Sequence, residues 1–286
     1  MRFALTPKRS VLDNLSRIAS GQLSQAIDVA RDKKRPTVDR IHAARARAKR
    51  VRGMLRIVGN ALPAYKTEDI AMHAAATSLS RTRDHDVLPQ TLEAILKRHR
   101  NWPADEVDRL RAAVADPSPD EERVLSAFAE MAEPIVVHVA LWAGPPPHWD
   151  DVVKGTAKTY ASARKKMHRA FETGVPADLH AWRRQVKYHL FHMLLLRRIT
   201  DGLAARREDV ADLEAVLGRH HDLEVLLDHV TERLSPEDSA VLRLGRDARK
   251  RQDKYVRRSE TLGRRLFGAR CKRFAEELRD RMTLEA

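Results

Sequence analysis

The sequence is poor in cysteine, glycine and proline, and each shortage excludes a class of protein. A single cysteine, Cys271, stands among 286 residues, so no intrachain disulfide and no zinc cluster of the CxxC type can form. Glycine and proline number 11 and 13, together below the roughly 12% of an average chain. Because alanine, leucine, arginine and glutamate are plentiful, the composition predicts an all-α protein.

Long apolar segments and aromatic residues are also scarce. The longest apolar stretch, 135–144, is too short to cross a bilayer, and residues 1–14 lack the apolar core of a signal peptide. With one cysteine, these absences predict a cytoplasmic protein without a membrane segment. Aromatic residues make up 5% of the chain, whereas readers of single-stranded nucleic acid normally stack bases on aromatic rings. Only non-specific nucleic-acid binding through phosphates stays open.

Positive charge is abundant and clustered. Lysine and arginine number 54 against 40 acidic residues, a formal net charge of +14. Segment 31–56 holds eleven basic and two acidic residues, and segment 243–273 holds thirteen and three, whereas 102–133 holds nine acidic and three basic residues. This segregation predicts a face whose positive potential attracts a polyanion.

Breaks rich in proline and glycine divide the chain into nine or ten predicted helices. Between these breaks apolar residues recur at intervals of three and four residues, as in helices, and the alternation of a strand does not persist. The triple proline at 145–147 predicts a hinge between two halves, because consecutive prolines cannot continue a helix. The breaks are 33–37, 63, 101–103, 116–119, 144–147, 174–176, 201–202 and 235–236.

The second half repeats the first at an offset of 138 residues. One register serves two separate blocks, which predicts a tandem of two similar helical bundles, at 8–143 and 148–283, within a single domain over 1–286. The aligned pairs are His42 and His180, Ala43 and Ala181, Arg45 and Arg183, Lys49 and Lys187, Leu79 and Leu217, Arg81 and Arg219, Asp84 and Asp222, and Val87 and Leu88 with Val225 and Leu226.

Basic side chains follow the histidine of each copy along one helix face. At 100° per residue the first set falls within an arc of about 80° and extends along about 21 Å of helix. A solvated helix face is the ordinary alternative, but repetition behind a histidine favours binding of a linear polyanion. The first set is His42, Arg45, Lys49, Arg52 and Arg56. The second, interrupted set is His180, Arg183, Arg184, Lys187 and Arg198.

Two further basic stripes lie on other predicted helices. If all stripes share one face or channel their fields add, whereas scattered stripes only aid solubility. The stripe near the C-terminus comprises Arg243, Arg246, Lys250, Arg257 and Arg264. The stripe after the triple proline comprises Lys154, Lys158, Lys165 and Arg169, with Arg164 and His168 beside it.

An aspartate closes each repeated block, Asp84 in the first and Asp222 in the second. Asp84 or Asp86 could cap a helix whose first turn contains Pro89, and Asp222 could cap a helix in the second copy. Alternatively, each could orient an arginine or a stripe histidine through a charge-assisted hydrogen bond. We expect these structural or orienting roles rather than direct catalysis.

The His-x-x-Arg-x-x-x-Lys motif at 42–49 and 180–187, followed by Arg/His-Asp at 83–84 and 221–222, resembles the CHAD family, the conserved histidine α-helical domains. The likeness runs over about residues 8–283. It implies two pseudo-symmetric four-helix bundles around a shared basic pore or face, binding of long-chain inorganic polyphosphate, and localisation at polyphosphate granules. By this resemblance the central ligand groups are His42, Arg45, Lys49, Arg52, His180, Arg183 and Lys187.

Some residues depart from the family pattern. Leu190 and Phe191 replace its usual basic and aromatic pair, and Gly53 lacks the aromatic. Many relatives are fused to a triphosphate tunnel enzyme that uses an ExExK strand, and this chain has no ExExK. The resemblance therefore implies a stand-alone binding module, not an enzyme, without a cofactor.

Two other classes remain as alternatives. A metal-dependent phosphohydrolase of HD type could use His73, His85, Asp86 and a later aspartate, because histidine and carboxylate suit such a metal. Under the repeat, however, His85 aligns with Leu223 and His73 with Ala211, so no metal constellation is duplicated. The second alternative is a non-specific nucleic-acid-binding protein, although no helix-turn-helix spacing stands out.

The stripe histidines predict a pH dependence. An imidazole among cations is harder to protonate when the site is empty and easier once phosphate arrives. We therefore expect polyanion affinity to rise as the pH falls from about 8 to about 6.

Overall fold

The computed structural model describes residues 3–98, 101–115 and 120–283, apart from the side chains of 80–86. Helices account for all of its regular structure in this part of the chain, so the predicted all-α class is confirmed. The helices are α1 (Val11–Arg31), α2 (Thr37–Leu55), the 3-10 turn η1 (Gly59–Ala61), α3 (Tyr65–Ser78), α4 (Ser80–Leu96), α5 (Ala104–Val114), α6 (Glu121–Ala140), α7 (Trp149–Thr173), α8 (Pro176–Leu196), α9 (Ala204–Thr231), α10 (Ser239–Phe267) and α11 (Cys271–Asp280).

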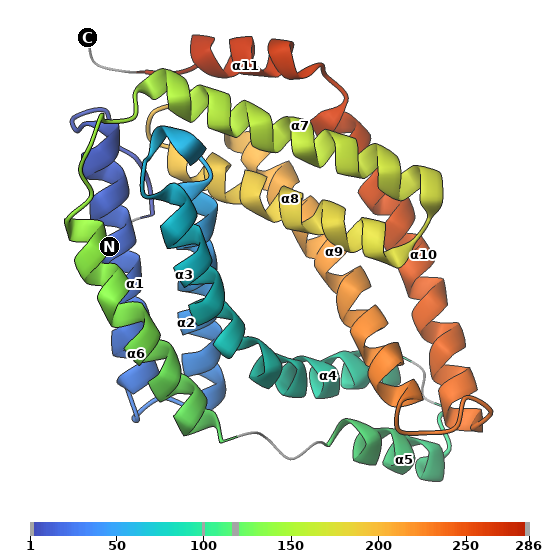
Figure 1. The fold of residues 1–286 in the computed structure, drawn as a ribbon. Helices are drawn as coiled ribbons and strands as arrows, with labels where there is room; N and C mark the ends of the chain where they lie inside the picture. The colour runs from blue at the N-terminus through green and yellow to red at the C-terminus, as the bar shows by residue number, and fades with distance from the viewer. Residues whose placement is uncertain (1–2, 99–100, 116–119, 284–286) are drawn as a thin grey trace.

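The described helices are arranged as a closed frame (Figure 1). On one side α1, α2, α3 and α6 pack together, and α7 and α8 cross to the other side, where α9 packs along α10. The frame is closed by α4 and α5, which contact α9 and α10. Helices from both halves of the sequence therefore contribute to the same frame.

The repeat offset relates the helices of the two halves unequally. Moved by 138 residues, α1 and α2 fall on α7 and α8. Both α3 and α4 fall on the single helix α9, and α5 falls on the first half of α10. The second half thus has longer, uninterrupted helices where the first has breaks. The division into two tandem bundles stays a prediction.

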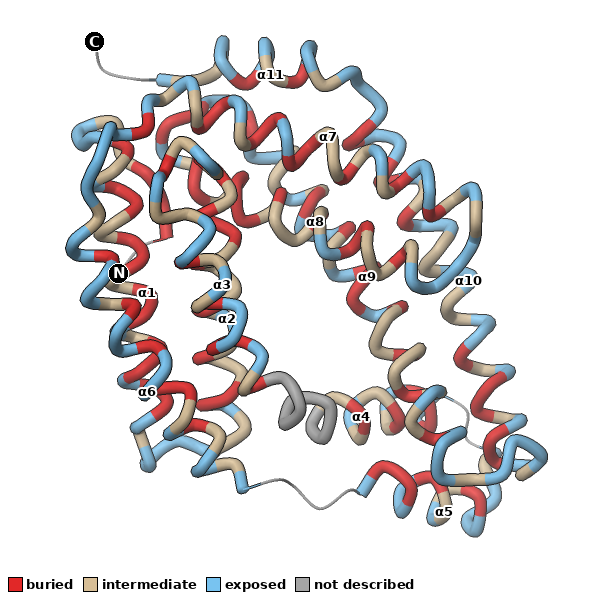
Figure 2. The backbone as a smooth tube through the Cα atoms, viewed as in Figure 1, coloured by how far each residue is buried: buried red, intermediate tan, exposed pale blue. Residues whose placement is uncertain are grey.

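Buried apolar side chains form two clusters in the described residues. The larger joins α1, α2, α3 and α6 to α7, α8, α11 and parts of α9 and α10. The smaller joins α4 and α5 to the C-terminal half of α9 and the N-terminal half of α10. In Figure 2 the buried segments of these helices turn toward one another. Packing therefore mixes the two sequence repeats in both clusters.

Helices α2 and α8 cross at close range within the larger cluster. Gly53 makes this approach possible, because a Cβ at this position would lie 2.4 Å from Cδ2 of Phe191. The next residue, His192, places Nε2 at 3.0 Å from the Gly53 carbonyl oxygen. That carbonyl is among the last four of α2, which lack a partner within the helix. The crossing thus fixes α2 against α8 by both shape and a hydrogen bond.

The predicted helix caps at the repeated aspartates are wrong. Asp222 lies in the interior of α9, which runs unbroken from Ala204 to Thr231. Pro89 lies well inside α4, which begins at Ser80. The backbone of Asp84 belongs to α4 as well, and its side chain lies outside the described residues. Continuous helix leaves no free N–H groups for either residue to cap.

The described residues contain no candidate membrane-spanning helix. None of these helices combines the length and apolar composition that spanning a bilayer requires.

Candidate anion-binding groove

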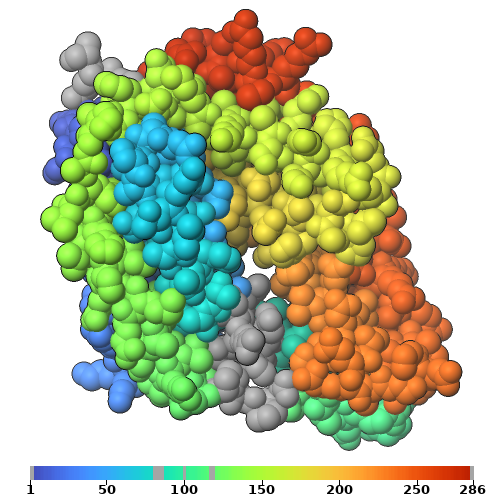
Figure 3. All heavy atoms as spheres, in the orientation of Figure 1, coloured from blue at the N-terminus to red at the C-terminus, as the bar shows by residue number. Residues whose placement is uncertain are grey.

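The histidine-led basic residues of α2 and α8 line one groove. Two adjoining clefts, of about 440 Å³ and 350 Å³, run between these helices. We call their union the α2–α8 groove. In Figure 3 an opening is visible between the atoms of α2 and α3 and those of α8 and α9, the four helices that supply the larger cleft. Both clefts are lined by Arg45, Lys49, Arg183, Lys187 and Phe191.

Among the described side chains, those that line the larger cleft include cations and imidazoles but no carboxylate. Its seven arginine and lysine side chains are Arg45, Lys49, Arg52, Arg56, Arg183, Arg184 and Lys187. His73, His180 and His221 also line it. His42 lines the smaller cleft, together with Arg50 and one carboxylate, Glu214. Low-dielectric walls that carry charge of one sign concentrate the field inside such a cleft.

Asp69 of α3 organises the end of the α2 row. Arg52 Nε donates to Asp69 Oδ1 at 3.0 Å, and Arg56 Nη2 donates to Oδ2 at 2.9 Å. Nη1 of Arg52 lies 3.0 Å from Nδ1 of His73. The Arg56 guanidinium lies over the ring of Tyr188, 4.5 Å from its centroid. These contacts fix the direction of both guanidinium groups at the groove wall.

Glu214 of α9 holds the α8 row in a similar way. Lys187 Nζ donates to Glu214 Oε1 at 2.9 Å, and Arg183 Nη2 lies 3.8 Å from the same oxygen. Burial acts to raise the pKa of Glu214, but Lys187, Arg183 and Lys49 together hold it below its usual value. Glu214 is therefore an anion inside the groove, and any bound polyanion competes with it for the same cations.

His180 and His221 form a pair at the groove. Their ring centroids lie 4.4 Å apart. Burial, and then the charges of His221, Arg183 and Arg184, lower the pKa of His180 to about 4. The direction is the one that the sequence predicts for an imidazole among cations. His180 is thus neutral near pH 7.

Three predicted ligand residues line a separate cleft on α7. Arg164, Lys165 and His168 surround about 390 Å³ of space together with Cys271 of α11. This cleft has no lining residue in common with the α2–α8 groove. The three residues therefore do not join the basic rows of α2 and α8.

The basic stripe of α10 also lies apart from the groove. Arg243 Nε is 2.9 Å from Glu106, a buried carboxylate of α5, and its guanidinium lies 5.5 Å from the ring of Trp102. Arg246, Lys250 and Arg257 are exposed on the same helix. No residue of α10 is among the described residues that line the groove. Their role as polyphosphate ligands stays a prediction.

Sequence reasoning missed several residues of the groove. Asp69 and Glu214 lack equivalents in the repeat, since the offset places Arg207 opposite Asp69 and Ala76 opposite Glu214. A search for duplicated features could not find them. Arg50 belongs to the basic run of segment 31–56 but falls outside the predicted arc.

Metal ligation is not evident in the described side chains. There, no group of three histidine, cysteine or acidic residues is placed to hold a metal ion. His73, one residue of the phosphohydrolase hypothesis, contacts Arg52. His85 and Asp86, the other two, lie outside the described side chains.

The fold and the groove define a helical domain in which two basic helix faces meet across one cleft. The chain belongs to the CHAD-domain family, whose family model matches residues 17–206. The crystal structure of the CHAD domain from the plant Ricinus communis is similar to it, with a TM-score of 0.62 and 17% identity, over 94% of this chain and 96% of that one.

A second solved structure has the same fold. PptA from Streptomyces chartreusis matches with a TM-score of 0.57 and 13% identity, over 91% of this chain and 100% of that one. No curated protein matches the sequence. Since the two structural matches cover more of the chain than the family model does, the shared fold extends beyond residues 17–206.

Proposed function

We propose that this protein binds inorganic polyphosphate in the α2–α8 groove as a binding module rather than as an enzyme. The observation that carries the proposal is the larger cleft, where the described lining residues include seven arginine and lysine side chains and no carboxylate. Polyphosphate is a linear polyanion without bases, so arginine and lysine donors suit it well. Membership of the CHAD family supports the same ligand.

The aromatic side chains of the groove favour polyphosphate over single-stranded nucleic acid. Phe191 is only 7% exposed and packs against Gly53. The Tyr188 ring is covered on one face by Arg56. Base recognition needs open aromatic faces for stacking, so a nucleic acid would be held here mainly by its phosphates.

Competition between defined polyanions tests this function. Polyphosphate, RNA and DNA of equal charge would be titrated at fixed ionic strength, with and without a divalent metal. We expect polyphosphate to bind most tightly, without metal and without hydrolysis, and its affinity to fall steeply with salt because counterions are released. Preference for nucleic acid would favour a non-specific nucleic-acid-binding protein, and metal-dependent hydrolysis would favour the phosphohydrolase.

The proposed ligand also gives an expected location. A protein that binds long polyphosphate would associate with polyphosphate granules in the cytoplasm. Fluorescently tagged protein should co-localise with granules and disperse when the cellular polymer is depleted. Unchanged foci after depletion would contradict a granule association through polyphosphate.

A further inference from the structure

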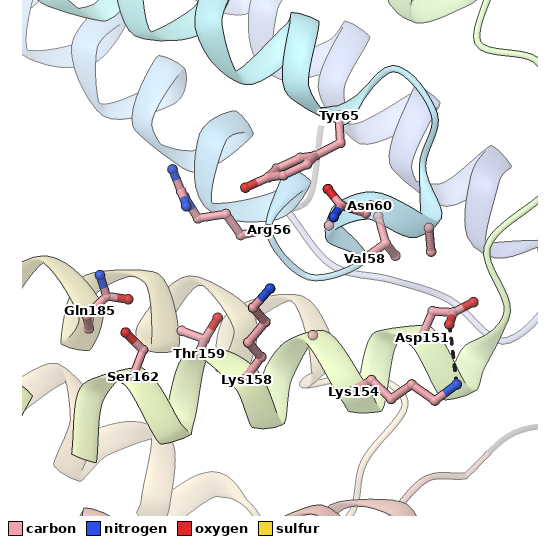
Figure 4. Close-up of a pocket in the computed structure, with 13 residues that line it drawn as sticks. Arg56, Val58, Asn60, Tyr65, Asp151, Lys154, Lys158, Thr159, Ser162 and Gln185 are labelled. Carbon is pink, nitrogen blue, oxygen red and sulfur yellow. Dashed lines mark ion pairs between the residues drawn. The ribbon is translucent and has the colours of Figure 1, made fainter. Parts of the chain in front are cut away.

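A third cleft continues the α2–α8 groove past the end of α2. It has a volume of about 410 Å³ and lies between α7 and the segment that holds η1 and the start of α3 (Figure 4). We call it the α7–η1 pocket. Arg56 and Gln185 line both this pocket and the larger cleft of the groove. A chain that follows the basic row of α2 therefore reaches the pocket at Arg56.

Close packing of α7 on the turn after α2 forms the floor of the pocket. Gly155 makes this contact possible, because a Cβ there would lie 1.9 Å from the carbonyl oxygen of Ile57. One turn further along α7, the side chain of Lys158 extends toward Asn60 and the turn after α2 (Figure 4). Lys158 is exposed and makes no ion pair with any side chain that the structure describes. Its ammonium group is thus available to an anion.

Apart from the carboxylate of Asp151, the other described polar side chains of the pocket can donate to phosphate oxygens. Lys154 lies 3.6 Å from Asp151 at the far end of the pocket. Tyr65 and Asn60 lie on the side of the pocket opposite α7, and the hydroxyl of Tyr65 points toward Arg56 (Figure 4). Burial raises the pKa of Tyr65, so its hydroxyl keeps the proton that it can donate. Hydroxyl, amide and ammonium donors together suit an oxygen-rich anion better than an apolar ligand.

We propose that the α7–η1 pocket is an additional phosphate subsite, which holds the part of a polyphosphate chain that extends beyond Arg56, with Lys158 as its main cation. The inference rests on the proposed function and adds a length dependence to it. Short chains are fully accommodated between α2 and α8. Longer chains gain contacts with Lys158, and at the far end with Lys154.

Chain-length dependence of the Lys158→Ala variant tests the subsite. Tripolyphosphate, intermediate chains and long-chain polyphosphate would be titrated against wild type and variant by calorimetry over a range of salt concentrations. We expect unchanged affinity for tripolyphosphate and about tenfold weaker binding of long chains, the loss of one charge-assisted contact. For long chains alone, the slope of log affinity against log salt should decrease by about 0.7 to 0.9.

Lys97→Ala serves as the matched control, because it removes the same charge from an exposed residue at the end of α4. Lys154→Ala is a second variant, with a smaller expected loss because Lys154 already has Asp151 as a partner. Equal losses for Lys158→Ala and Lys97→Ala, or a loss that is the same at every chain length, would overturn the subsite. Failure of the wild type to bind polyphosphate at all would instead overturn the proposed function, and the subsite with it.

Discussion

The α2–α8 groove and the α10 stripe look alike in sequence and differ in three dimensions. Each is a row of basic residues at helical spacing. The rows of α2 and α8 face each other across clefts of about 440 Å³ and 350 Å³, with Gly53 against Phe191 at the crossing. On α10, by contrast, Arg243 pairs with buried Glu106, and Arg246 and Lys250 are exposed to solvent. Helical periodicity gathers charge on a face, but only helix packing decides whether two such faces meet.

Matched double substitutions in the two regions give the largest expected contrast. Arg45→Ala with Lys49→Ala should weaken polyphosphate binding by about a hundredfold or more, because two charge-assisted contacts are lost. Arg246→Ala with Lys250→Ala removes the same charge from α10 and should change affinity by less than about threefold, the contribution of general charge. Calorimetric titration measures both.

The outcome that breaks this comparison is an equal loss from the two pairs. Net charge alone would then govern binding. Circular dichroism must show that both variants fold, because long basic side chains also pack against apolar surface. Lys8→Ala with Arg9→Ala, at exposed positions near the N-terminus, provides a second control for charge.

Arg243 should matter to stability and not to binding. Arg243→Ala leaves the Glu106 carboxylate, 5% exposed, without its partner at 2.9 Å. Losing one partner of a buried ion pair lowers the free energy of unfolding, here by roughly 2 kcal/mol because Arg243 itself is partly exposed. Urea unfolding measures this change. A large loss of polyphosphate affinity in folded Arg243→Ala protein would place α10 in the binding site after all.

Removal of the groove's own carboxylate should strengthen binding. Glu214→Gln frees Lys187 and Arg183 from an anion that competes with phosphate, and we expect about tenfold higher affinity for short chains. Asp212→Asn, on the same helix, is the matched control, since Asp212 is exposed and 3.7 Å from Arg258 outside the groove. Weaker binding by Glu214→Gln would mean that the carboxylate mainly positions the two cations.

The smallest expected effect concerns His180. Its pKa of about 4 should rise when phosphate binds, so binding takes up a proton. Affinity should therefore increase as the pH falls below the pKa of the complex, and level off near 4. More of the increase in affinity should therefore occur below pH 6 than an ordinary histidine pKa of 6.5 would suggest. His180→Gln should flatten it, whereas His168→Gln on α7 should not.

Titrations in two buffers of different ionisation enthalpy count the protons taken up. An unchanged pH slope in His180→Gln would remove this histidine from the binding equilibrium.

The lowered pKa of His180 also affects the stability of the fold. Because the pKa is lower in the folded state than the ordinary 6.5, the stability that His180 contributes is complete above pH 6.5 and is lost as the pH falls toward 4.

Sequence reasoning predicted most helix ends that proline or glycine marks, but it missed the one at Gly268, between α10 and α11. The breaks around Pro63, Gly144 and Gly174 all separate helices in the structure. It missed the break at Leu79, between α3 and α4, because neither proline nor glycine lies there. It also placed caps at Asp222 and near Pro89, where tertiary packing instead keeps α9 and α4 continuous. Local signals are overridden when burial favours a longer helix.

The site was predictable only in part for a similar reason. The repeat identified the histidine-led rows on α2 and α8, which the structure brings together. It could not show that Arg164, Lys165 and His168 of α7 and the α10 stripe lie apart from the groove, because one-dimensional spacing carries no information on helix crossing. Nor could it show that Asp69 and Glu214, single residues outside any motif, lie beside these cations. Such partners are defined by the fold alone.

Gly53, which has no side chain, determines how closely α2 and α8 approach each other along the groove. Phe191 occupies the space that a Cβ of residue 53 would need. The distance between the basic faces of α2 and α8 therefore depends on glycine at this position and not on the cations themselves. A larger residue there would separate the walls while every arginine and lysine stayed in the sequence. The spacing between the two rows of cations is therefore determined by a residue that carries no charge.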